Sequence, residues 1–297
     1  MKKIKLLIIF VSPLFLILLF FVFFTLSSYL KIPQPKPPQP ISPQTSSPES
    51  TERKPAEFII QEKGNSEKLA DGLYFQKIYL LDQANPQEER KIQLNLLKIN
   101  PQKRKFKLLI NPDLKKSLKD IFLANNCLAG TNGMFFTKEN TLIGLLVENS
   151  KIVHPFQKSR LTTGIFYLDQ QQNPHIVSAS SFTNFNQPFA LQSGPIILFS
   201  NGETEIKSDD QKKVSRTFIA VDKNKQTYLC VVKDESGLFT HGLSLFEAQK
   251  IFSNQSLNFG VNFLAVLNLD GGTSSALFTP NLYLKEEKFT QNGICLL

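Results

Sequence analysis

Four short polar segments, each at the end of a run of apolar residues, hold the side chains of this sequence that are best suited to chemistry. They are residues 130–136 (GTNGMFF), 190–195 (ALQSGP), 215–222 (SRTFIAVD) and 267–275 (LNLDGGTSS). Strand ends hold side chains rigidly, and glycine lets the backbone approach a ligand closely. We therefore interpret these four segments as the candidate functional site.

Asp270 and Arg216 are the charged residues of these segments that favour a functional interpretation. Asp270 follows an apolar strand, so we expect it to be partly buried, and a buried carboxylate needs partners or a raised pKa. Arg216 stands in an otherwise apolar strand, where its planar guanidinium would bind a phosphate or a carboxylate through two hydrogen bonds. The residues after Asp270 offer N–H and hydroxyl donors that suit an anion such as phosphate: Gly271, Gly272, Thr273, Ser274 and Ser275.

Each segment also has a purely structural interpretation. Asn132-Gly133 and Asp270-Gly271 are dipeptides that form type I′ hairpin turns, and Ser-Gly-Pro at 193–195 is an ordinary turn sequence. Arg216 could form a structural salt bridge, with Asp270 as one partner. Taken singly, each segment fits a turn better than a site, so the order and spacing of all four must decide.

That order and spacing resemble the phosphodiester glycosidase family. The resemblance covers residues 92–278, and its most specific parts are DGGTSS at 270–275 and QSGP at 192–195. Thr273 stands where many relatives have a third glycine, and Met134 stands where a small residue is common. Both departures are similar to the bacterial exported branch of the family rather than to its animal enzyme.

The resemblance implies an enzyme that cleaves the bond between the anomeric carbon of a sugar and a phosphodiester oxygen. Asp270, Arg216 and Asn132 are the catalytic residues that it implies. Asp270 would be one of the two carboxylates that glycoside hydrolysis usually needs, and Glu148, Asp222 and Glu247 are equal candidates for the second. No histidine base accompanies the serines, so we do not expect a covalent serine mechanism.

The remaining site residues would bind the substrate. Arg216 and backbone N–H groups near Gly194 and Gly271 would hold the phosphodiester, while Asn132 and Gln192 would bind sugar hydroxyls or orient water. The substrate-binding residues implied are Gly133, Gln192, Ser193, Gly194, Gly271, Gly272, Ser274 and Ser275. The alternative is a non-catalytic envelope domain that binds an anionic glycan in the same cleft.

No cofactor motif is present, and the metal requirement stays open. The three histidines share no ligand-like spacing, which disfavours a zinc site of His and Cys but leaves an oxygen-ligated divalent metal open. Three cysteines are too few for a disulfide scaffold, and we expect Cys127 and Cys230, in apolar surroundings, to be buried free thiols.

Residues 57–297 are predicted to form a single α+β domain with a large mixed or antiparallel sheet system and few helices. Short apolar or alternating runs bounded by turn residues recur throughout and indicate strands. Only residues 113–125 and 244–254 have helical periodicity, and Ser244 with Glu247 forms a capping box at the start of the second.

The first 56 residues predict a membrane anchor followed by a spacer. Three lysines precede an uncharged apolar run at 6–30, and about 20 such residues suffice to span a bilayer. The lysines favour a cytoplasmic N-terminus, so the domain would lie outside the cytoplasm, although a cleaved signal peptide is the alternative. The proline-rich residues 31–56 are typical of an extended spacer.

The charge distribution argues against a nucleic-acid partner. The formal charge is +9, but residues 1–56 carry seven basic and two acidic side chains, which supply +5 of it. The densest basic run in the domain, KRKFK at 103–107, is interpreted as a turn and a strand with solvated lysines. The expected partners are therefore a phosphodiester-linked glycan and, through residues 1–30, the membrane.

Overall fold

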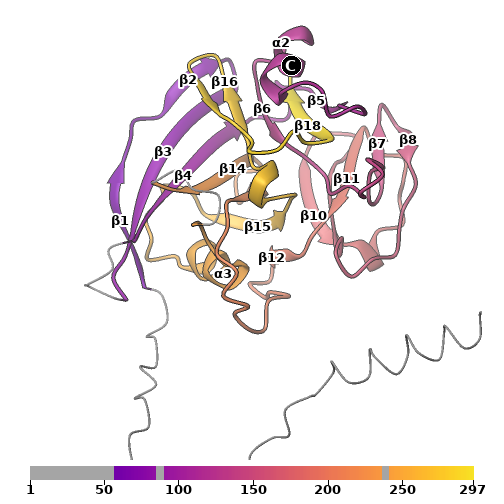
Figure 1. Cartoon of the computed structure of the whole chain (residues 1–297). Helices are drawn as coiled ribbons and strands as arrows, with labels where there is room; N and C mark the ends of the chain where they lie inside the picture. Colours follow the sequence, from indigo (N-terminus) through magenta and orange to yellow (C-terminus); the bar gives the residue numbers. More distant parts are fainter. Residues whose placement is uncertain (1–56, 85–89, 236–240) are drawn as a thin grey trace, which may run out of the picture. The chain divides into compact units, whose positions relative to one another are not determined.

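The computed structural model describes residues 57–84, 90–235 and 241–297 (Figure 1). All of them belong to one compact unit, Glu52–Leu297. The predicted anchor (1–30) and spacer (31–56) lie outside the described residues. Within the described part of the chain, no helix combines the length and the apolar character that crossing a membrane requires.

The described residues form three sheets in which every strand pairing is antiparallel. The largest has the order β1 (Phe58–Lys63), β3 (Leu73–Asp82), β4 (Arg90–Ile99), β14 (Thr227–Asp234), β13 (Arg216–Asp222), β15 (Phe263–Asn268) and β12 (Ile196–Leu198), with β2 (Glu67–Ala70) on β3. The second has the order β10 (Pro174–Ser178), β9 (Gly164–Leu168), β11 (Phe189–Ser193), β7 (Leu146–Glu148) and β8 (Lys151–His154). The third has the order β17 (Leu282–Leu284), β16 (Leu277–Thr279), β6 (Ala129–Asn132), β18 (Asn292–Leu296) and β5 (Phe106–Ile110).

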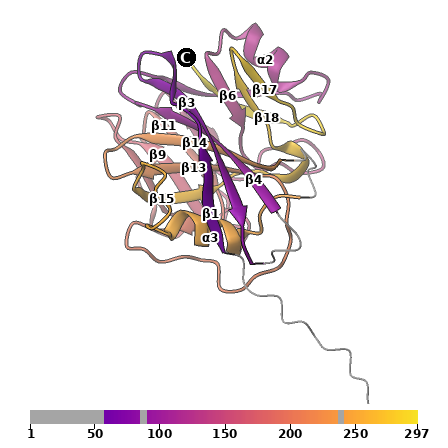
Figure 2. The ribbon, with the colours of Figure 1, turned by 90° about the vertical axis from the view of Figure 1, so that its left-hand side faces the viewer.

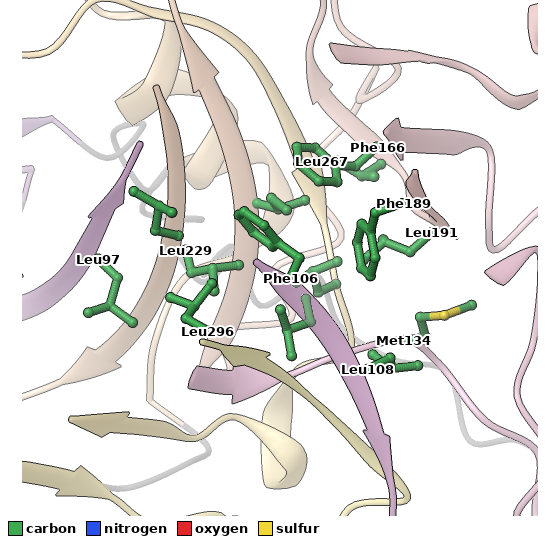
Figure 3. Close-up of a cluster of buried hydrophobic side chains, with 14 of the residues drawn as sticks. Leu97, Phe106, Leu108, Met134, Phe166, Phe189, Leu191, Leu229, Leu267 and Leu296 are labelled. Atoms are coloured by element: carbon green, nitrogen blue, oxygen red, sulfur yellow. The ribbon is translucent and has the colours of Figure 1, made fainter. Parts of the chain in front are cut away.

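One hydrophobic core lies between the three sheets (Figure 3). Leu97 and Leu229 enter it from the large sheet, Leu191 from the second and Leu296 from the third. Phe106 joins the third sheet to the second, because its ring lies 5.9 Å from that of Phe166 and 5.8 Å from that of Phe189. The three sheets are therefore held by a shared core, which fixes the relative positions of their strand ends.

The central strands of the large sheet are buried on both faces. In β13, Ile219 and Val221 face the shared core, whereas Phe218 and Ala220 face a second cluster that includes α3 (Leu245–Ser253). Side chains alternate between faces along a strand, so a strand covered on both sides is an uninterrupted apolar run. This explains the continuous apolar character of β13 and β14.

The described residues contain two α-helices, α2 (Leu118–Ala124) and α3, each packed on the outside of a sheet. Figures 1 and 2 place α2 beside β6 and β18. The capping box predicted for the second helix is confirmed, because Ser244 Oγ accepts from Glu247 N and Glu247 Oε2 accepts from Ser244 N. The predicted start of the first helix at residue 113 is wrong: Ser117 is the N-cap, so the helix begins at Leu118.

The expectation that Cys127 is a free thiol is wrong, because Cys127 forms a disulfide with Cys295. The two are 168 residues apart in sequence, and they meet because β6 pairs with β18, in the register Gly130 opposite Cys295. Cys230 is a buried free thiol, as predicted.

Candidate active site

The four polar segments predicted from the sequence meet at the end of β15. β6 and β11 contribute their C-terminal ends from the third and second sheets, and β13 and β15 come from the large sheet. Backbone hydrogen bonds join them: Asn268 N to Pro195 O (3.1 Å), Leu269 N to Thr217 O (2.8 Å), Asp270 N to Gly133 O (3.1 Å) and Gly272 N to Ser215 O (2.7 Å). The candidate site is therefore the place where all three sheets converge.

Asn132 is fully buried and connects three of these segments. Its Nδ2 donates to the Asp270 carbonyl (2.6 Å), and its Oδ1 accepts from the Thr217 hydroxyl (2.7 Å) and from Ala276 N (3.0 Å). Both lone pairs of the amide oxygen are therefore occupied by the protein. In this arrangement Asn132 positions Asp270 through the backbone, and its oxygen has no capacity left for a sugar hydroxyl.

Gln192 is also fully buried and binds the loop that follows β8. Its Oε1 accepts from Leu145 N (2.9 Å) and Gln157 N (3.2 Å), and its Nε2 donates to Gln157 O (2.6 Å) and Thr162 O (2.8 Å). With two acceptors and two donors in use, the amide is satisfied by the protein alone. Gln192 thus fixes residues 157–162 next to the site.

Gly133 and Gly194 allow close packing between segments. A Cβ at Gly133 would lie 2.4 Å from Asn292 Oδ1, the atom that accepts from Met134 N. A Cβ at Gly194 would lie 2.6 Å from Thr163 N. Atoms this close would clash, so these glycines are explained by protein contacts rather than by the approach of a ligand.

Asp270 is half-buried, and one of its oxygens has no partner. Oδ1 accepts from Gly271 N at 2.9 Å, while Oδ2 is buried with no hydrogen bond to any described residue. Burial raises the pKa of Asp270 to about 6, and the nearby Ser274 side chain and the Gly271 N–H act in the opposite direction. A carboxyl group with a pKa near neutrality can take up or release a proton at the pH of most cells.

Other buried polar atoms in the four segments also lack partners among the described residues. They are Ser193 Oγ, Ser215 Oγ and Asn268 Oδ1. Buried polar groups in folded proteins are nearly always hydrogen-bonded, because leaving one unpaired costs about 1–3 kcal/mol. Together with Asp270 Oδ2 these atoms make four unpaired oxygens around one strand end. A site that binds a polar ligand or ordered water would leave such atoms without a protein partner.

Arg216 lies on the other face of β13 from Thr217. Its Nε donates to Leu243 O (2.9 Å) and its Nη2 to Lys212 O (2.7 Å). Burial lowers the pKa of its guanidinium. The described residues contain no ion pair between Arg216 and Asp270, so the expectation of Asp270 as its salt-bridge partner is wrong. Arg216 still adjoins the site, because a Cβ at Gly271 would lie 3.8 Å from its Cδ.

The residues after Asp270 form a short 3₁₀ turn, η2 (Gly272–Ser274). Gly272 has a φ of 60°, and a Cβ built there would meet nothing within 4 Å. Ser275 Oγ lies 3.3 Å from Thr217 Oγ1, which places it in the network around Asn132. Of the glycines in the candidate site, Gly272 is therefore the one with open space beside it, where a ligand can reach the backbone.

The three other carboxylates considered from the sequence have structural partners. Glu148 Oε1 accepts from Leu108 N (2.6 Å). Asp222, at the far end of β13, accepts from Asn224 N, Gln226 N and the Tyr228 hydroxyl. Glu247 caps α3 and forms ion pairs with Arg90 (2.7 Å) and Lys213 (3.3 Å). None of them has a hydrogen bond to Asp270.

Lys233 is a residue of the site region that the sequence analysis missed. Lys233 follows Val232, which pairs with Arg216 across the sheet. Lys233 is buried, its Nζ donates to Lys285 O (3.0 Å), and burial lowers its pKa to about 8. A lysine at the end of a buried strand (TYLCVVKD) is the signal that could have identified it.

Residues 285–288 border the site on the side of η2. Glu287 N and Lys288 N both donate to Thr273 O, at 2.8 and 3.1 Å. Both side chains are exposed, so a carboxylate and an ammonium flank the turn that follows Asp270. Nothing in the local residue pattern distinguishes this segment from an ordinary polar turn.

The described residues contain no group of three or more His, Cys, Asp or Glu side chains arranged to hold a metal ion. The polar atoms that converge here are hydroxyl, amide and carboxylate oxygens with backbone N–H groups. Chemically, this set can bind hydroxyl groups and an anion around one titratable carboxyl group.

Comparisons with known proteins point to one family. The family model for phosphodiester glycosidases matches residues 125–295, which is more than half of the chain. Zebrafish N-acetylglucosamine-1-phosphodiester alpha-N-acetylglucosaminidase, whose catalytic domain was solved auto-inhibited by its pro-peptide, is similar with a TM-score of 0.58 and 14% identity, over 80% of this chain and 88% of that one. A hypothetical protein from Synechocystis is similar with a TM-score of 0.57 and 14% identity, over 78% of this chain and 63% of that one. This chain therefore spans less than two thirds of the Synechocystis protein, and no curated protein matches it.

Proposed function

The chain belongs to the phosphodiester glycosidase family, and on that premise we propose that it hydrolyses sugars linked through their anomeric carbon to a phosphodiester. The observation that carries the proposal is Asp270. It is a half-buried carboxyl group with a pKa of about 6 and one unpaired oxygen, at the convergence of three sheets. A merely structural carboxylate would have partners for both oxygens.

In the proposed reaction Asp270 acts as the general base. Water attacks the anomeric carbon, Asp270 Oδ2 takes its proton, and the bond from carbon to the phosphate oxygen breaks with its electron pair on that oxygen. A phosphate monoester is a stable leaving group, so it needs little help from a general acid. The ionised form of Asp270 dominates at pH 7, because its pKa is about 6.

Neighbouring groups would bind the substrate. Gly272 has open space beside it, and the unpaired Ser215 hydroxyl lies at the same turn, because Gly272 N donates to Ser215 O. The Ser215 hydroxyl can donate to a phosphodiester oxygen at this position. The unpaired oxygens of Ser193 and Asn268 suit sugar hydroxyls. Asn132 and Arg216 would act by positioning the turn rather than by touching substrate.

The location and the natural substrate are also part of this proposal. We place the domain outside the cytoplasm, attached to the membrane by residues 1–30 and raised from it by residues 31–56. The lysines and the apolar run of the N-terminus support this arrangement. The substrates would then be phosphodiester-linked glycans of the cell envelope or surface.

The test is hydrolysis of sugar-1-phosphodiesters by the wild-type protein and by Asp270→Asn. We expect turnover of phosphodiesters but not of alkyl glycosides, with a fall of about 10²–10⁴-fold in Asp270→Asn. The kcat/KM of the wild type should decrease below pH 6, and this decrease should be absent from the residual activity of the variant. Asp71→Asn is the matched control, because Asp71 is an exposed carboxylate paired with Lys103.

Full activity of Asp270→Asn would remove Asp270 from the mechanism. Glycan binding without turnover in the wild type would instead favour the alternative of a non-catalytic domain that binds anionic glycans.

A further inference from the structure

The segment formed by β8 and the loop after it, residues 151–161, exposes large apolar side chains to solvent. The exposed fractions are 56% for Ile152 and Val153, 38% for Phe156 and 44% for Leu161. The described residues include eight exposed large apolar side chains, and these four lie within eleven consecutive positions. Single exposed apolar residues are normal, but a cluster marks a surface that contacts something other than water.

The same segment carries only positive charge. Lys151, Lys158 and Arg160 are exposed, and no Asp or Glu occurs between residues 149 and 168. The carboxylates nearest to it in the bonding network are engaged inward: Glu148 accepts from Leu108 N, and Glu205 accepts from Ile196 N and the Thr163 hydroxyl. Apolar side chains mixed with unneutralised cations match an anionic lipid surface.

The geometry of β8 favours a fluid partner over a folded one. Among the described strands β8 lies at an edge, where β7 is its one partner. β8 is irregular at this point: Ile152 pairs with Val147 and His154 with Leu146, so Val153 is an extra residue without a partner in the register. A bulge at a sheet edge interrupts the regular row of N–H and C=O groups that an added strand would need, whereas a lipid phase needs no regular backbone partner.

The segment is fixed next to the candidate active site. Gln192 binds Gln157 and Thr162 through its amide, and Gly194 packs against Leu161 O and Thr163 N. Its position is therefore set by the same strand end that contributes Ser193 to the site. A surface that engages this segment also determines where the site opening faces.

We propose that residues 151–161 insert into the interface of an anionic lipid bilayer, with the apolar side chains among the acyl chains and the cations at the headgroups. This insertion holds the site at the bilayer surface, where a lipid-linked or membrane-proximal glycan would reach it. It depends on neither the hydrolytic activity nor the predicted N-terminal anchor, because it concerns contacts of the folded domain itself.

The chain contains no tryptophan, so a single introduced tryptophan reports on one position without background. We choose Ile152→Trp in the full chain, with Leu123→Trp as the matched control, since Leu123 is exposed to 54% on α2. Each variant is mixed with phosphatidylglycerol–phosphatidylcholine vesicles or with phosphatidylcholine vesicles, and brominated acyl chains serve as the quencher. We expect quenching and a shift of emission to shorter wavelength only for Ile152→Trp, and more strongly with the anionic lipid.

Removing the cations tests the electrostatic part. The double substitution Lys158→Gln and Arg160→Gln, on the Ile152→Trp background, should lower the partition constant of the protein onto the anionic vesicles about thirtyfold. No quenching of Ile152→Trp, or equal quenching of Leu123→Trp, would overturn the proposal. Emission at shorter wavelength without quenching by brominated lipid would show that a protein covers β8, which would also overturn it.

Discussion

Asp270→Asn should make the protein more stable at alkaline pH, although it removes the proposed base. The pKa of Asp270 is raised by burial from its ordinary value of 3.8 to about 6. The folded state therefore favours the protonated form, so this group stabilises the fold fully below pH 3.8, and that stabilisation is lost as the pH rises through about 6. At pH 8 the folded protein holds a carboxylate that would be better solvated in the unfolded chain.

The size of the effect follows from the two pKa values. The difference between 3.8 and about 6 corresponds to about 3 kcal/mol of destabilisation at high pH. Asp270 is only half-buried and solvent weakens the effect, so we expect about 1–2 kcal/mol. Asparagine keeps the volume of the side chain and carries no charge. The free energy of unfolding of the variant should therefore exceed that of the wild type by this amount at pH 8, and the difference should disappear below pH 4.

Urea denaturation of the wild type, Asp270→Asn and Asp71→Asn between pH 4 and pH 8 would measure this dependence. Asp71 is the control, because its pKa shifts in the opposite direction: the hydrogen bond and charge of Lys103 lower it. Asp71→Asn should therefore be neutral or slightly less stable than the wild type at pH 8. A lower stability of Asp270→Asn at pH 8 would show that the carboxylate is favourably paired, and the explanation of its pKa by burial would then be wrong.

Three further predictions concern the structure around the site. Asn132→Ala should lower the free energy of unfolding by about 2–4 kcal/mol in urea denaturation, because it leaves buried partners unpaired. Gly133→Ala should destabilise the protein and lower activity, because its Cβ would lie 2.4 Å from Asn292 Oδ1; normal values of both would contradict the close packing. Cys127→Ala should remove up to about 5 kcal/mol, given a loop of 168 residues, and reductant should then have no further effect on the melting temperature.

The strand ends of the site could be predicted from the sequence because each is a local pattern. A polar group that follows an apolar run indicates a strand end, and all four of the predicted segments do end or begin strands at the site. Whether an amide there binds the protein or a ligand is a different question. The partner of Asn132 Nδ2 is 138 residues away, and no local pattern encodes that contact.

The face of the sheet on which the Arg216 side chain lies could not be predicted, for a related reason. Along β13 the middle positions, 218–221, are all apolar, because the sheet is covered on both faces. Alternation of polar and apolar residues, which normally reveals the face of each side chain, is therefore missing. The position of Arg216 on the face opposite Thr217 became visible only with the partners of both residues.

The disulfide and Lys233 depend on sheet topology in the same way. Cys127 and Cys295 are adjacent because β18, near the end of the described chain, pairs with β6. Lys233 reaches the site region because β14 and β13 are neighbours in the large sheet. Both facts follow from strand order, which the apolar runs alone do not specify.

The convergence of three sheets also accounts for the division of roles among the glycines. Gly133 and Gly194 are close to atoms of other segments, and Gly164 would place a Cβ 2.5 Å from Leu267 of the large sheet. These contacts allow strands of different sheets to end together without side chains between them. Gly272, with open space beside it, is left as the position where a ligand can approach the backbone. A ligand bound there would lie beside Ser215 and the turn that carries Asp270, which is why a substrate anion at Gly272 and proton transfer at Asp270 belong to the same site.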